Sequence, residues 1–470
     1  MERIRTDVCV IGAGSGGLSV AAGAAQMGAR VVLVEAAEMG GDCLNAGCVP
    51  SKALLAAARA AQVMRAAGVF GIGAVEPAID FAAVKDHVAR TIAAIAPHDS
   101  QERFEALGVR VLRAPGRFVS PRELEAGGIR IRARRFVIAT GSRPVIPPIP
   151  GIERVNALTN ETIFALRDRP EHLVVIGGGP VGIEMAQAHR RLGCRVTVIA
   201  GARALPKEDP ELAAILLACL RAEGVEILEG ARAEAVEPTA TGLAVIAGGR
   251  RIEGSHLLVA AGRRPATEGL GLDLAGVEVT AAGVVVGPGL RSTNRRILAV
   301  GDVAGQGQFT HLAGYHAGVV IRAILFGLPS RTGAVIPRVT YADPELAQVG
   351  LTEAEARARH GDRLTVIRQP WQGSDRAQAE ARTEGLLKLM VAGGRPVGVS
   401  ILGERAGELV GLWSLALAAR VRLSAVAGLV LPYPTLGELS KRAAGAYFSP
   451  KLFDNPLVRG AVRLVQRLVP

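Results

Sequence analysis

The sequence predicts an α/β fold with two Rossmann-like domains followed by a C-terminal α+β domain. Three observations support this prediction. A strand–glycine turn–helix–strand pattern lies near the N-terminus, a second copy follows further along the chain, and from Pro337 onward strands and helices mix without glycine-rich turns. At 470 residues the chain has room for roughly two to four domains, and its 49% apolar content allows a large buried core.

The first pattern runs from an apolar strand at 7–11 to Glu35. Between them lie the glycine motif Gly12, Gly14 and Gly17, a helical run and a second apolar strand. The first glycine allows a tight turn, the second lets the backbone approach a pyrophosphate, and the third lets the helix pack on the strand. The helix N-terminus offers N–H donors to phosphate. This segment therefore predicts a dinucleotide-binding unit.

The second pattern begins with a strand at 172–176, which continues into Gly177, Gly179 and Gly182. A helical run and another strand, ending at Ala200, complete it. Two such units in one chain suggest two different dinucleotides. An ordinary parallel strand–helix–strand unit without a ligand is the alternative for each copy.

The net charge of +12 invites a nucleic-acid or membrane interpretation. Only six of the 55 basic residues are lysine, and the arginines are spread along the whole chain. The sequence has no basic stripe, zinc spacing or known DNA-reading motif. The composition fits codon bias as well as any partner, so no nucleic-acid partner is expected.

No signal peptide is expected at the N-terminus, because a glycine-rich turn follows Asp7 instead of a long apolar run. The apolar stretch 409–431 is broken by Arg420 and Arg422, and no transmembrane helix is expected. A cytoplasmic location follows as the prediction.

The five cysteines fall into two groups. Cys9, Cys194 and Cys219 belong to strand or helix patterns and are expected to be small core residues. Cys43 and Cys48 lie close together in a polar, glycine-rich segment. A pair of this kind in a reducing compartment is more often catalytic or metal-binding than structural. Zinc would need a further Cys or His pair, so no metal site is expected.

Residues 40–52 read GGDCLNAGCVPSK and resemble the active-site signature of the pyridine nucleotide-disulfide oxidoreductases. That family includes dihydrolipoamide dehydrogenase, glutathione reductase and mercuric reductase, and the resemblance covers essentially the whole chain. It implies a redox disulfide in which Cys48 is the thiolate near the flavin and Cys43 the outer sulfur that meets the substrate. A helix start at Cys48, with Pro50 in the first turn, suits this role because a helix N-terminus lowers a thiol pKa.

The resemblance also implies an FAD site. The first glycine motif would hold the pyrophosphate of FAD, Glu35 would hold the adenosine ribose, and Asp302 would hold the ribityl chain. Lys52 and Glu184 would form an ion pair beside the flavin edge where hydride arrives. For His311, backbone contact along the flavin ring and simple packing both remain open. The complete expected FAD set is Gly12, Gly14, Gly17, Glu35, Lys52, Thr140, Gly141, Asp302 and His311.

The implied architecture is an FAD-binding domain over 1–146 and 265–336, an NAD(P)H-binding domain over 147–264, and a dimerisation domain over 337–470. The implied assembly is a homodimer in which Tyr433 and Glu438 complete the partner's site.

The second dinucleotide unit favours NADPH. NAD-binding units usually end their second strand in an Asp or Glu that accepts from the ribose 2′-hydroxyl, and here Ala200 takes that place. Arg203 could bind a 2′-phosphate. The expected NADPH residues are Gly177, Gly179, Gly182 and Arg203. NADH, with Arg203 in solvent, is the alternative.

The C-terminal segment bears on the substrate. Thiol-disulfide members carry a His-Pro-Thr segment with a Glu five residues after the His; here Tyr433 replaces the His, and Glu438 is the Glu. A phenol with a reference pKa of about 10 is a poor proton shuttle at neutral pH, which disfavours lipoamide or glutathione reduction. Mercuric reductases also have Tyr here, and the segments 432–444 and 95–100 resemble theirs. Their usual C-terminal cysteine pair is missing at 467–470.

The predicted function is therefore mercuric reductase-like transfer of electrons from NADPH, through FAD and the cysteine pair, to a thiol-bound metal ion or an unusual disulfide. The alternatives are a dihydrolipoamide dehydrogenase or other disulfide reductase, a quinone-type flavin reductase, and a non-catalytic flavoprotein.

The tail 457–469 alternates apolar residues with Arg459, Arg463 and Arg467, which share one helix face. A helix packed on the dimer with a solvated arginine face is the favoured interpretation. Weak contact with a membrane surface is the second.

Overall fold

The computed structural model describes residues 2–469 and divides into two compact units. Unit 1 comprises Met1–Gln62, Glu76–Gly201 and Gly230–Gly333. Unit 2 comprises Val63–Val75, Ala202–Glu229 and Ala334–Pro470.

A seven-stranded sheet forms the first half of unit 1, in the order β3-β2-β1-β6-β5-β4 with β19 beside β6. Its strands are β1 (Glu2–Ile11), β2 (Val31–Glu35), β3 (Val109–Arg113), β4 (Gly116–Ser120), β5 (Glu123–Ala126), β6 (Ile129–Ile138) and β19 (Ile297–Ala299). β1, β2, β3, β6 and β19 are parallel, and every residue of β2 is buried. Burial on both faces explains the unbroken apolar runs at 31–34 in β2 and at 8–11 in β1.

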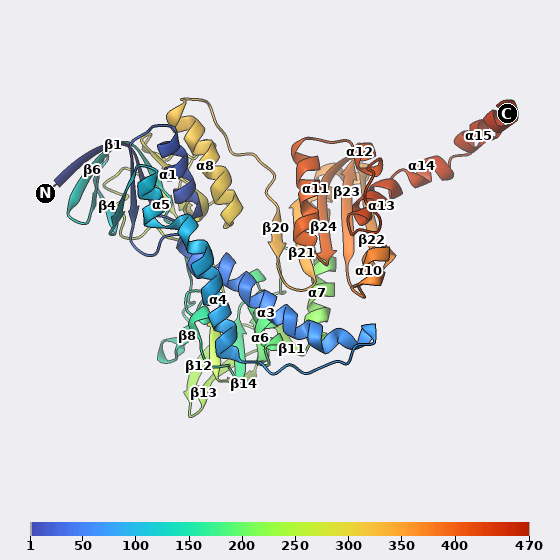
Figure 1. Cartoon of the computed structure of the whole chain (residues 1–470), viewed down its shortest axis with the longest axis horizontal. Coiled ribbons are helices and arrows are strands. Elements are labelled where there is room, and N and C mark those ends of the chain that lie inside the picture. Colours follow the sequence, from blue (N-terminus) through green and yellow to red (C-terminus); the bar gives the residue numbers. More distant parts are fainter. Residues whose placement is uncertain (1, 470) are drawn as a thin grey trace. The chain divides into compact units, whose positions relative to one another are not determined.

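Helices α1 (Ser15–Gln26) and α8 (Thr310–Leu325) lie side by side against this sheet (Figure 1). The chain passes from β1 through the first glycine motif into α1 and returns as β2, as the sequence predicts. The remaining helices that begin in unit 1 are α2 (Gly41–Asn45), α3 (Cys48–Ala66), α4 (Phe81–Ile95) and α5 (Gln101–Ala106).

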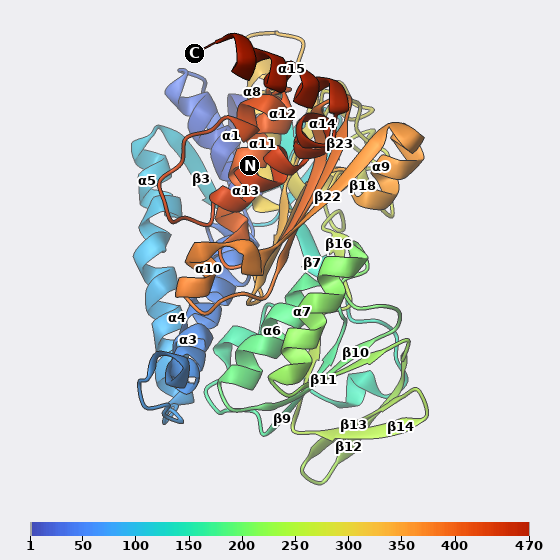
Figure 2. The same cartoon turned by 90° about the vertical axis from the view of Figure 1, so that its right-hand side faces the viewer.

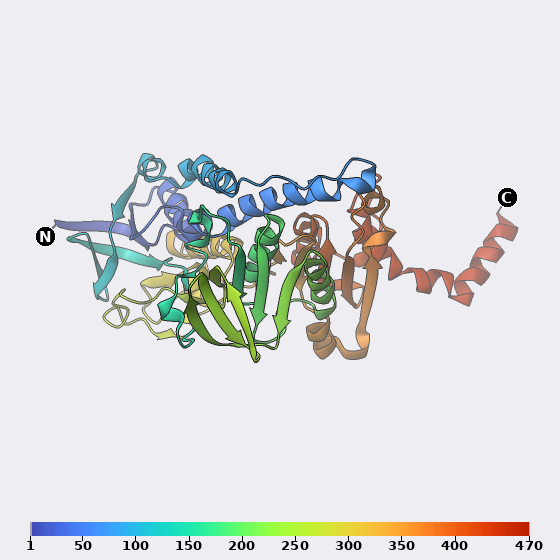
Figure 3. The same ribbon diagram turned by 90° about the horizontal axis from the view of Figure 1, so that it is seen from below.

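A second parallel sheet in unit 1 contains β10 (Arg195–Ala200), β9 (His172–Ile176), β15 (His256–Val259) and β8 (Ala157–Leu158), in that order. α6 (Pro180–Arg191) follows the second glycine motif and packs on β9 and β10 (Figure 2). Figure 3 shows a separate antiparallel sheet as yellow-green arrows. Its strands are β12 (Ala233–Thr239), β13 (Gly242–Ala247) and β14 (Arg250–Gly254).

Two short strand pairs complete unit 1. They are β7 (Ser142–Pro144) with β16 (Arg263–Pro265), and β17 (Val279–Thr280) with β18 (Gly283–Val284).

Unit 2 is built on an antiparallel sheet in the order β20-β21-β24-β23-β22. The strands are β20 (Arg338–Thr340), β21 (Glu345–Gly350), β22 (Leu364–Pro370), β23 (Leu386–Ala392) and β24 (Arg395–Gly403). α11 (Ala406–Ala418) packs on β21 and β24, and α13 (Glu438–Ala446) packs on β22 and β23. Trp371 and Trp413 are fully buried in the core of this unit.

Unit 2 also holds shorter elements and the tail. These are α7 (Pro210–Ala222), β11 (Val225–Glu229), α9 (Glu353–His360), α10 (Asp375–Ala379), α12 (Leu423–Ala427), α14 (Ser449–Phe453) and α15 (Pro456–Leu468). α15 projects from its own unit (Figure 1), and none of its described side chains is buried.

The α/β fold class with two Rossmann-like sheets and a C-terminal α+β domain is confirmed. The boundaries at 146/147, 264/265 and 336/337 stay predictions.

The expectation of no transmembrane helix stays a prediction. Within residues 2–469, the helical stretch Gly41–Phe70 is long and apolar enough to cross a membrane. This single criterion is weak, since core helices of other proteins also meet it. The same stretch carries both Cys43 and Cys48.

Candidate active site

Two thiols lie at adjoining helix ends in unit 1. Cys48 is the first residue of α3, and Cys43 lies in α2. Both are free cysteines, and their side chains hydrogen bond to each other. The Cys48 Sγ also lies 3.2 Å from the Thr310 Oγ1, at the start of α8. The Cys48 side chain therefore has two partners from different parts of the chain, besides its place at a helix N-terminus.

The two thiols differ in acidity. The hydrogen bond from Cys43 lowers the pKa of Cys48 to about 6; burial opposes this shift, while Thr310 and the charge of Lys52 add to it. The pKa of Cys43 is raised above its ordinary value, first because its thiol bonds to Cys48 and then because it is buried. At neutral pH the pair therefore holds its proton on Cys43 and its negative charge on Cys48.

A polar network fixes the segment that carries Cys43. The Arg263 guanidinium lies 3.2 Å from a carboxylate oxygen of Asp42 and donates to the Asn160 side-chain oxygen at 3.1 Å. Asn160 in turn donates to Asp42 and to the backbone oxygen of Ala46. These bonds fix the chain at Asp42 and at Ala46, on either side of Cys43.

The same arginine reaches Asp302. Arg263 Nε donates to the Ser142 hydroxyl at 2.8 Å, and that hydroxyl donates to Asp302 Oδ2 at 2.6 Å. Burial raises the pKa of Asp302, and its bond with Ser142 and the charge of Arg263 oppose that shift. Asp302 lies just after β19, at the carboxyl end of the first sheet, where ligands of open α/β sheets bind.

Lys52 and Glu184 come together. Lys52 Nζ lies 2.9 Å from Glu184 Oε2 and connects α3 with α6. Glu184 is largely buried, whereas the Lys52 side chain is 38% exposed. The positive charge therefore lies at the rim of the site, close enough to lower the pKa of Cys48.

The first glycine motif has the shape that a pyrophosphate requires. Gly12 has φ +104°, and a Cβ there would lie 2.4 Å from the Ala139 oxygen. A Cβ on Gly17 would lie 1.9 Å from the Gly12 oxygen, so helix and strand pack without space for a side chain. A Cβ on Gly14 would meet nothing nearer than 3.9 Å. The turn is therefore open at Gly14, next to the N-terminus of α1. This opening leaves room for a pyrophosphate, so the residues of the motif fit the binding of FAD.

Glu35 lies at the end of β2, almost fully buried. Its two carboxylate oxygens accept from the backbone N–H groups of Ala13 and Ala37, which fixes the carboxylate beside the glycine motif. Thr140 donates to the Ala266 oxygen, and Gly141 takes φ +68°. His311 is exposed in the first turn of α8, with its ring stacked on Phe309.

The second glycine motif repeats this geometry. A Cβ on Gly182 would lie 2.0 Å from the Gly177 oxygen, whereas Gly179 has open space around it. At the end of β10, Ala231 N–H donates to the Ala200 oxygen, which brings the following residue, the exposed Arg232, beside this strand end. Sequence reasoning missed Arg232 because it lies 32 positions after Ala200, outside the motif.

Arg203 belongs to unit 2. Its guanidinium donates to the backbone oxygens of Pro206 and Glu208, both at 3.2 Å, so its own loop holds it. Arg203 remains a predicted phosphate ligand on the sequence argument alone.

Tyr433 and Glu438 also lie in unit 2. The Tyr433 hydroxyl donates to Asp375 at 2.9 Å, and this bond, with the nearby carboxylate charge, raises the pKa of the phenol. The Tyr433 side chain is exposed, and Glu438 begins α13.

Unit 1 thus brings together most of the predicted FAD and redox residues around the carboxyl end of its first sheet. Sequence reasoning missed Thr310, Arg263, Asn160 and Ser142. Thr310 is adjacent to His311 in a segment already singled out, but its bond to Cys48 spans 262 positions. Cys9 and Cys194 are buried as expected, whereas Cys219 is only half-buried.

Comparison with known proteins agrees with this geometry. Residues 6–317 match the family described as pyridine nucleotide-disulphide oxidoreductase, and residues 336–444 match its dimerisation domain. The chain is 36% identical over 460 residues to a mercuric reductase of Streptomyces lividans, covering 94% of this chain and 96% of the relative. It is 38% identical over 456 residues to a dihydrolipoyl dehydrogenase of Thermus scotoductus, covering 94% and 97%.

Among solved structures, the chain is similar to the Cu(II) complex of the HOCl-induced flavoprotein disulfide reductase RclA from Escherichia coli. The TM-score is 0.86 at 26% identity, covering 94% of this chain and 99% of that one. The relatives thus differ in the substrates their names give.

Proposed function

The chain belongs to the pyridine nucleotide-disulphide oxidoreductases, and from that premise we propose that it reduces a thiol-bound metal ion or an unusual disulfide with electrons from NADPH. It is an FAD- and NAD(P)H-dependent oxidoreductase of the class that acts on sulfur groups or metal ions. The single observation that carries the proposed redox role of the cysteine pair is the unequal acidity of Cys43 and Cys48.

The proposed redox centre cycles between a Cys43–Cys48 disulfide and a dithiol. Two electrons and one proton open the disulfide to a Cys43 thiol and a Cys48 thiolate. The pair gives two electrons to the acceptor and releases that proton as the disulfide closes again. Bound FAD supplies the two-electron transfer between the nicotinamide and this disulfide. Cys48 keeps the negative charge inside the site, and Cys43 attacks or binds the acceptor. Thr310 stabilises the Cys48 thiolate by donating to it.

The proposed FAD ligands follow from the fit of the first glycine motif. The backbone at Gly12, Gly14 and Gly17 would hold the pyrophosphate, Glu35 the adenosine ribose, and Asp302 the ribityl chain. Lys52, paired with Glu184, would place its charge beside the redox centre.

The proposed nicotinamide cofactor is NADPH. Gly177, Gly179 and Gly182 would hold its pyrophosphate, and the carboxylate that would reject a 2′-phosphate is replaced by Ala200. Arg203, with Arg232 as an added candidate, would bind the 2′-phosphate.

The choice of acceptor rests on Tyr433. A phenol bonded to Asp375, with its pKa raised, is a still poorer proton donor at neutral pH than a free phenol. Reduction of a common disulfide needs a group that delivers a proton to the leaving thiol. Transfer of two electrons to Hg(II) held by thiols needs sulfur ligands, which Cys43 and Cys48 supply.

The test is NADPH oxidation by the FAD-loaded enzyme with Hg(II)–thiol complexes, lipoamide, glutathione disulfide and quinones as acceptors. We expect the Hg(II) complex to give the highest kcat/KM, and Cys43→Ala to lower it by about a hundredfold or more. Cys219→Ala is the matched control and should change nothing. If Cys43→Ala kept full turnover with quinones, the protein would be a flavin reductase instead. If the parent enzyme turned over lipoamide faster than the Hg(II) complex, it would be a dihydrolipoamide dehydrogenase.

The assembly proposed is a cytoplasmic homodimer formed through the dimerisation domain, with Tyr433 and Glu438 near the partner's redox centre. α15 presents Leu457, Leu464 and Leu468 to solvent in the single chain. We place this apolar face against the partner subunit, with the arginines solvated. Removal of residues 456–470 should then leave co-sedimentation with anionic liposomes unchanged; selective pelleting of the full chain would indicate a membrane contact.

A further inference from the structure

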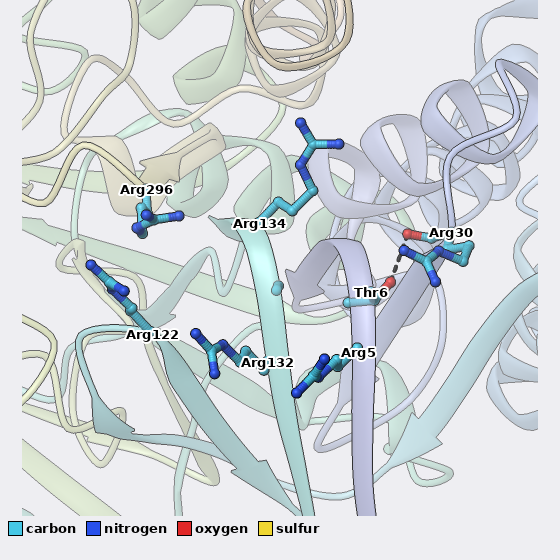
Figure 4. Close-up of a pocket in the computed structure, with 8 residues that line it drawn as sticks. Arg5, Thr6, Arg30, Arg122, Arg132, Arg134 and Arg296 are labelled. Carbon is cyan, nitrogen blue, oxygen red and sulfur yellow. Dashed lines mark hydrogen bonds between the residues drawn. The ribbon is translucent and has the colours of Figure 1, made fainter.

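Arginines from separate segments of unit 1 gather at one region of its first sheet. They line two cavities of about 530 and 370 Å³, and Arg296 lines both. The arginines are Arg5, Arg30, Arg122, Arg132, Arg134, Arg135, Arg291, Arg295 and Arg296. Figure 4 shows the arginines that line the smaller cavity. We call this group the arginine cluster.

Strand pairing creates the arginine cluster. Arg5 on β1 lies directly opposite Arg132 on β6 in the parallel register. Arg134 points to the same face of β6, two residues on. The Arg296 oxygen accepts from the Phe136 N–H at 2.9 Å, which brings Arg296 beside the end of β6. Like charges placed opposite each other destabilise a sheet, so this arrangement is costly without an anion.

The carboxylates nearby do not balance this charge. Asp7 bonds Arg30 at 3.1 Å and lies 3.9 Å from Arg134. Glu123 on β5 lies opposite Arg132 on β6, but their side chains form no ion pair in the described part of the chain. Among the described residues, no acidic side chain lines either cavity.

Arg135 shows the imbalance most clearly. Its Nε is buried and has no hydrogen-bond partner within residues 2–469. Burial lowers the pKa of Arg135, and the charges of Arg291, Arg296 and Arg134 lower it further. A buried donor surrounded by cations is what an anionic ligand would satisfy.

The lining chemistry favours phosphate groups. Guanidinium forks bind phosphate oxygens in pairs, and arginine supplies every charged side chain that lines the cavities. Within residues 2–469 no aromatic side chain lines the cavities, so a nucleic-acid base would find no ring to stack on, which disfavours nucleic acid. Two cavities that share Arg296 suit several linked anionic groups better than one.

We propose that the arginine cluster binds a chain of anhydride-linked phosphates, either inorganic polyphosphate or the phosphate tail of a nucleotide. This site lies outside the glycine motifs and the cysteine pair, and the proposal does not depend on the proposed function.

The experiment is calorimetric titration of the FAD-loaded full chain, with NADP⁺ present to fill the nicotinamide site. The probes are tripolyphosphate, ATP and single phosphate at equal ionic strength. We expect tripolyphosphate to bind at least about tenfold more tightly than single phosphate, since it engages more arginines. The double variant Arg132→Gln/Arg296→Gln should weaken the binding of tripolyphosphate by about tenfold or more.

The matched control is Arg90→Gln/Arg154→Gln, which removes two exposed unit 1 arginines outside the arginine cluster. It should change affinity by less than about twofold. Flavin absorbance establishes that each variant is folded. If ATP and tripolyphosphate bind with equal affinity, the phosphate tail of a nucleotide can be the natural ligand. If ATP binds more weakly, the ligand is an inorganic phosphate chain. Both results support the proposal.

Three results would overturn it. The first is equal affinity for tripolyphosphate and single phosphate. The second is an equal loss of affinity in the control variant. The third is tighter binding of a single-stranded DNA oligonucleotide than of polyphosphate with the same number of charges, which would indicate a nucleic-acid surface.

Discussion

At the scale of single residues, the acidity of Cys48 depends on a neighbour far away in sequence. Thr310 donates to the Cys48 thiolate and shares in lowering its pKa to about 6. Hydrogen bonds to charged groups contribute about 1.5–3 kcal/mol, and one pKa unit corresponds to about 1.4 kcal/mol.

Thr310→Val should therefore raise the pKa of Cys48 by about one unit or more, because the hydroxyl donor is lost while the side-chain size is kept. Thr310→Ser keeps the donor and is the control. The measurement is thiolate absorbance near 240 nm of the reduced enzyme against pH. An unchanged midpoint in Thr310→Val would mean that the hydroxyl has no part in stabilising the thiolate.

At the scale of elements, a buried ion network ties α7, α9 and β23 of unit 2 together. Lys388 is 2% exposed and lies 2.9 Å from both oxygens of Asp209, 2.7 Å from Glu211 and 3.1 Å from Glu353. Burial lowers the pKa of Lys388, but these three carboxylates outweigh it and raise the pKa.

Lys388→Met should destabilise unit 2 by about 3–5 kcal/mol, because Asp209 stays buried without its counter-ion. Lys388→Met/Asp209→Asn should recover part of the loss, since Asn keeps the helix cap of α7 without the charge. Urea unfolding followed by tryptophan fluorescence measures both, since Trp371 and Trp413 lie in this unit. Equal midpoints for the single variant and the parent would contradict the prediction.

The same network adds a pH dependence to the parent protein. Burial raises the pKa of Glu353, but its bonds to Arg357 and Lys388 outweigh burial and lower the pKa from 4.5 to about 2. A carboxyl with a depressed pKa contributes stability above its ordinary pKa and loses it as pH falls through the folded value. The contribution is therefore present above pH 4.5 and lost between there and about pH 2.

The elements show what the sequence could and could not predict. The strand–glycine–helix units and the cysteine segment follow from local spacing, so their residue ranges and turn conformations are predictable. The bonds of Thr310 to Cys48 and of Arg263 to Asp42 join distant segments, and no local pattern encodes them. The arginine cluster was hidden for the same reason: arginines that look scattered meet only through the pairing of β1 with β6.

At the scale of the whole molecule, the account is that NADPH and FAD, bound at the two glycine motifs, pass electrons to one asymmetric thiol pair. Unit 1 holds both glycine motifs and the pair, and unit 2 carries the dimerisation domain. The roles assigned to the two sulfurs depend on Cys48 being the one that stays ionised.

The most direct measurement is the long-wavelength flavin–thiolate absorbance of the reduced enzyme, compared between Cys43→Ser and Cys48→Ser. The account predicts that Cys43→Ser keeps the band and Cys48→Ser loses it. In the parent enzyme the band should fade as pH falls through about 6, since protonation removes the Cys48 thiolate. A band that survives in Cys48→Ser would contradict the assignment of the two sulfurs.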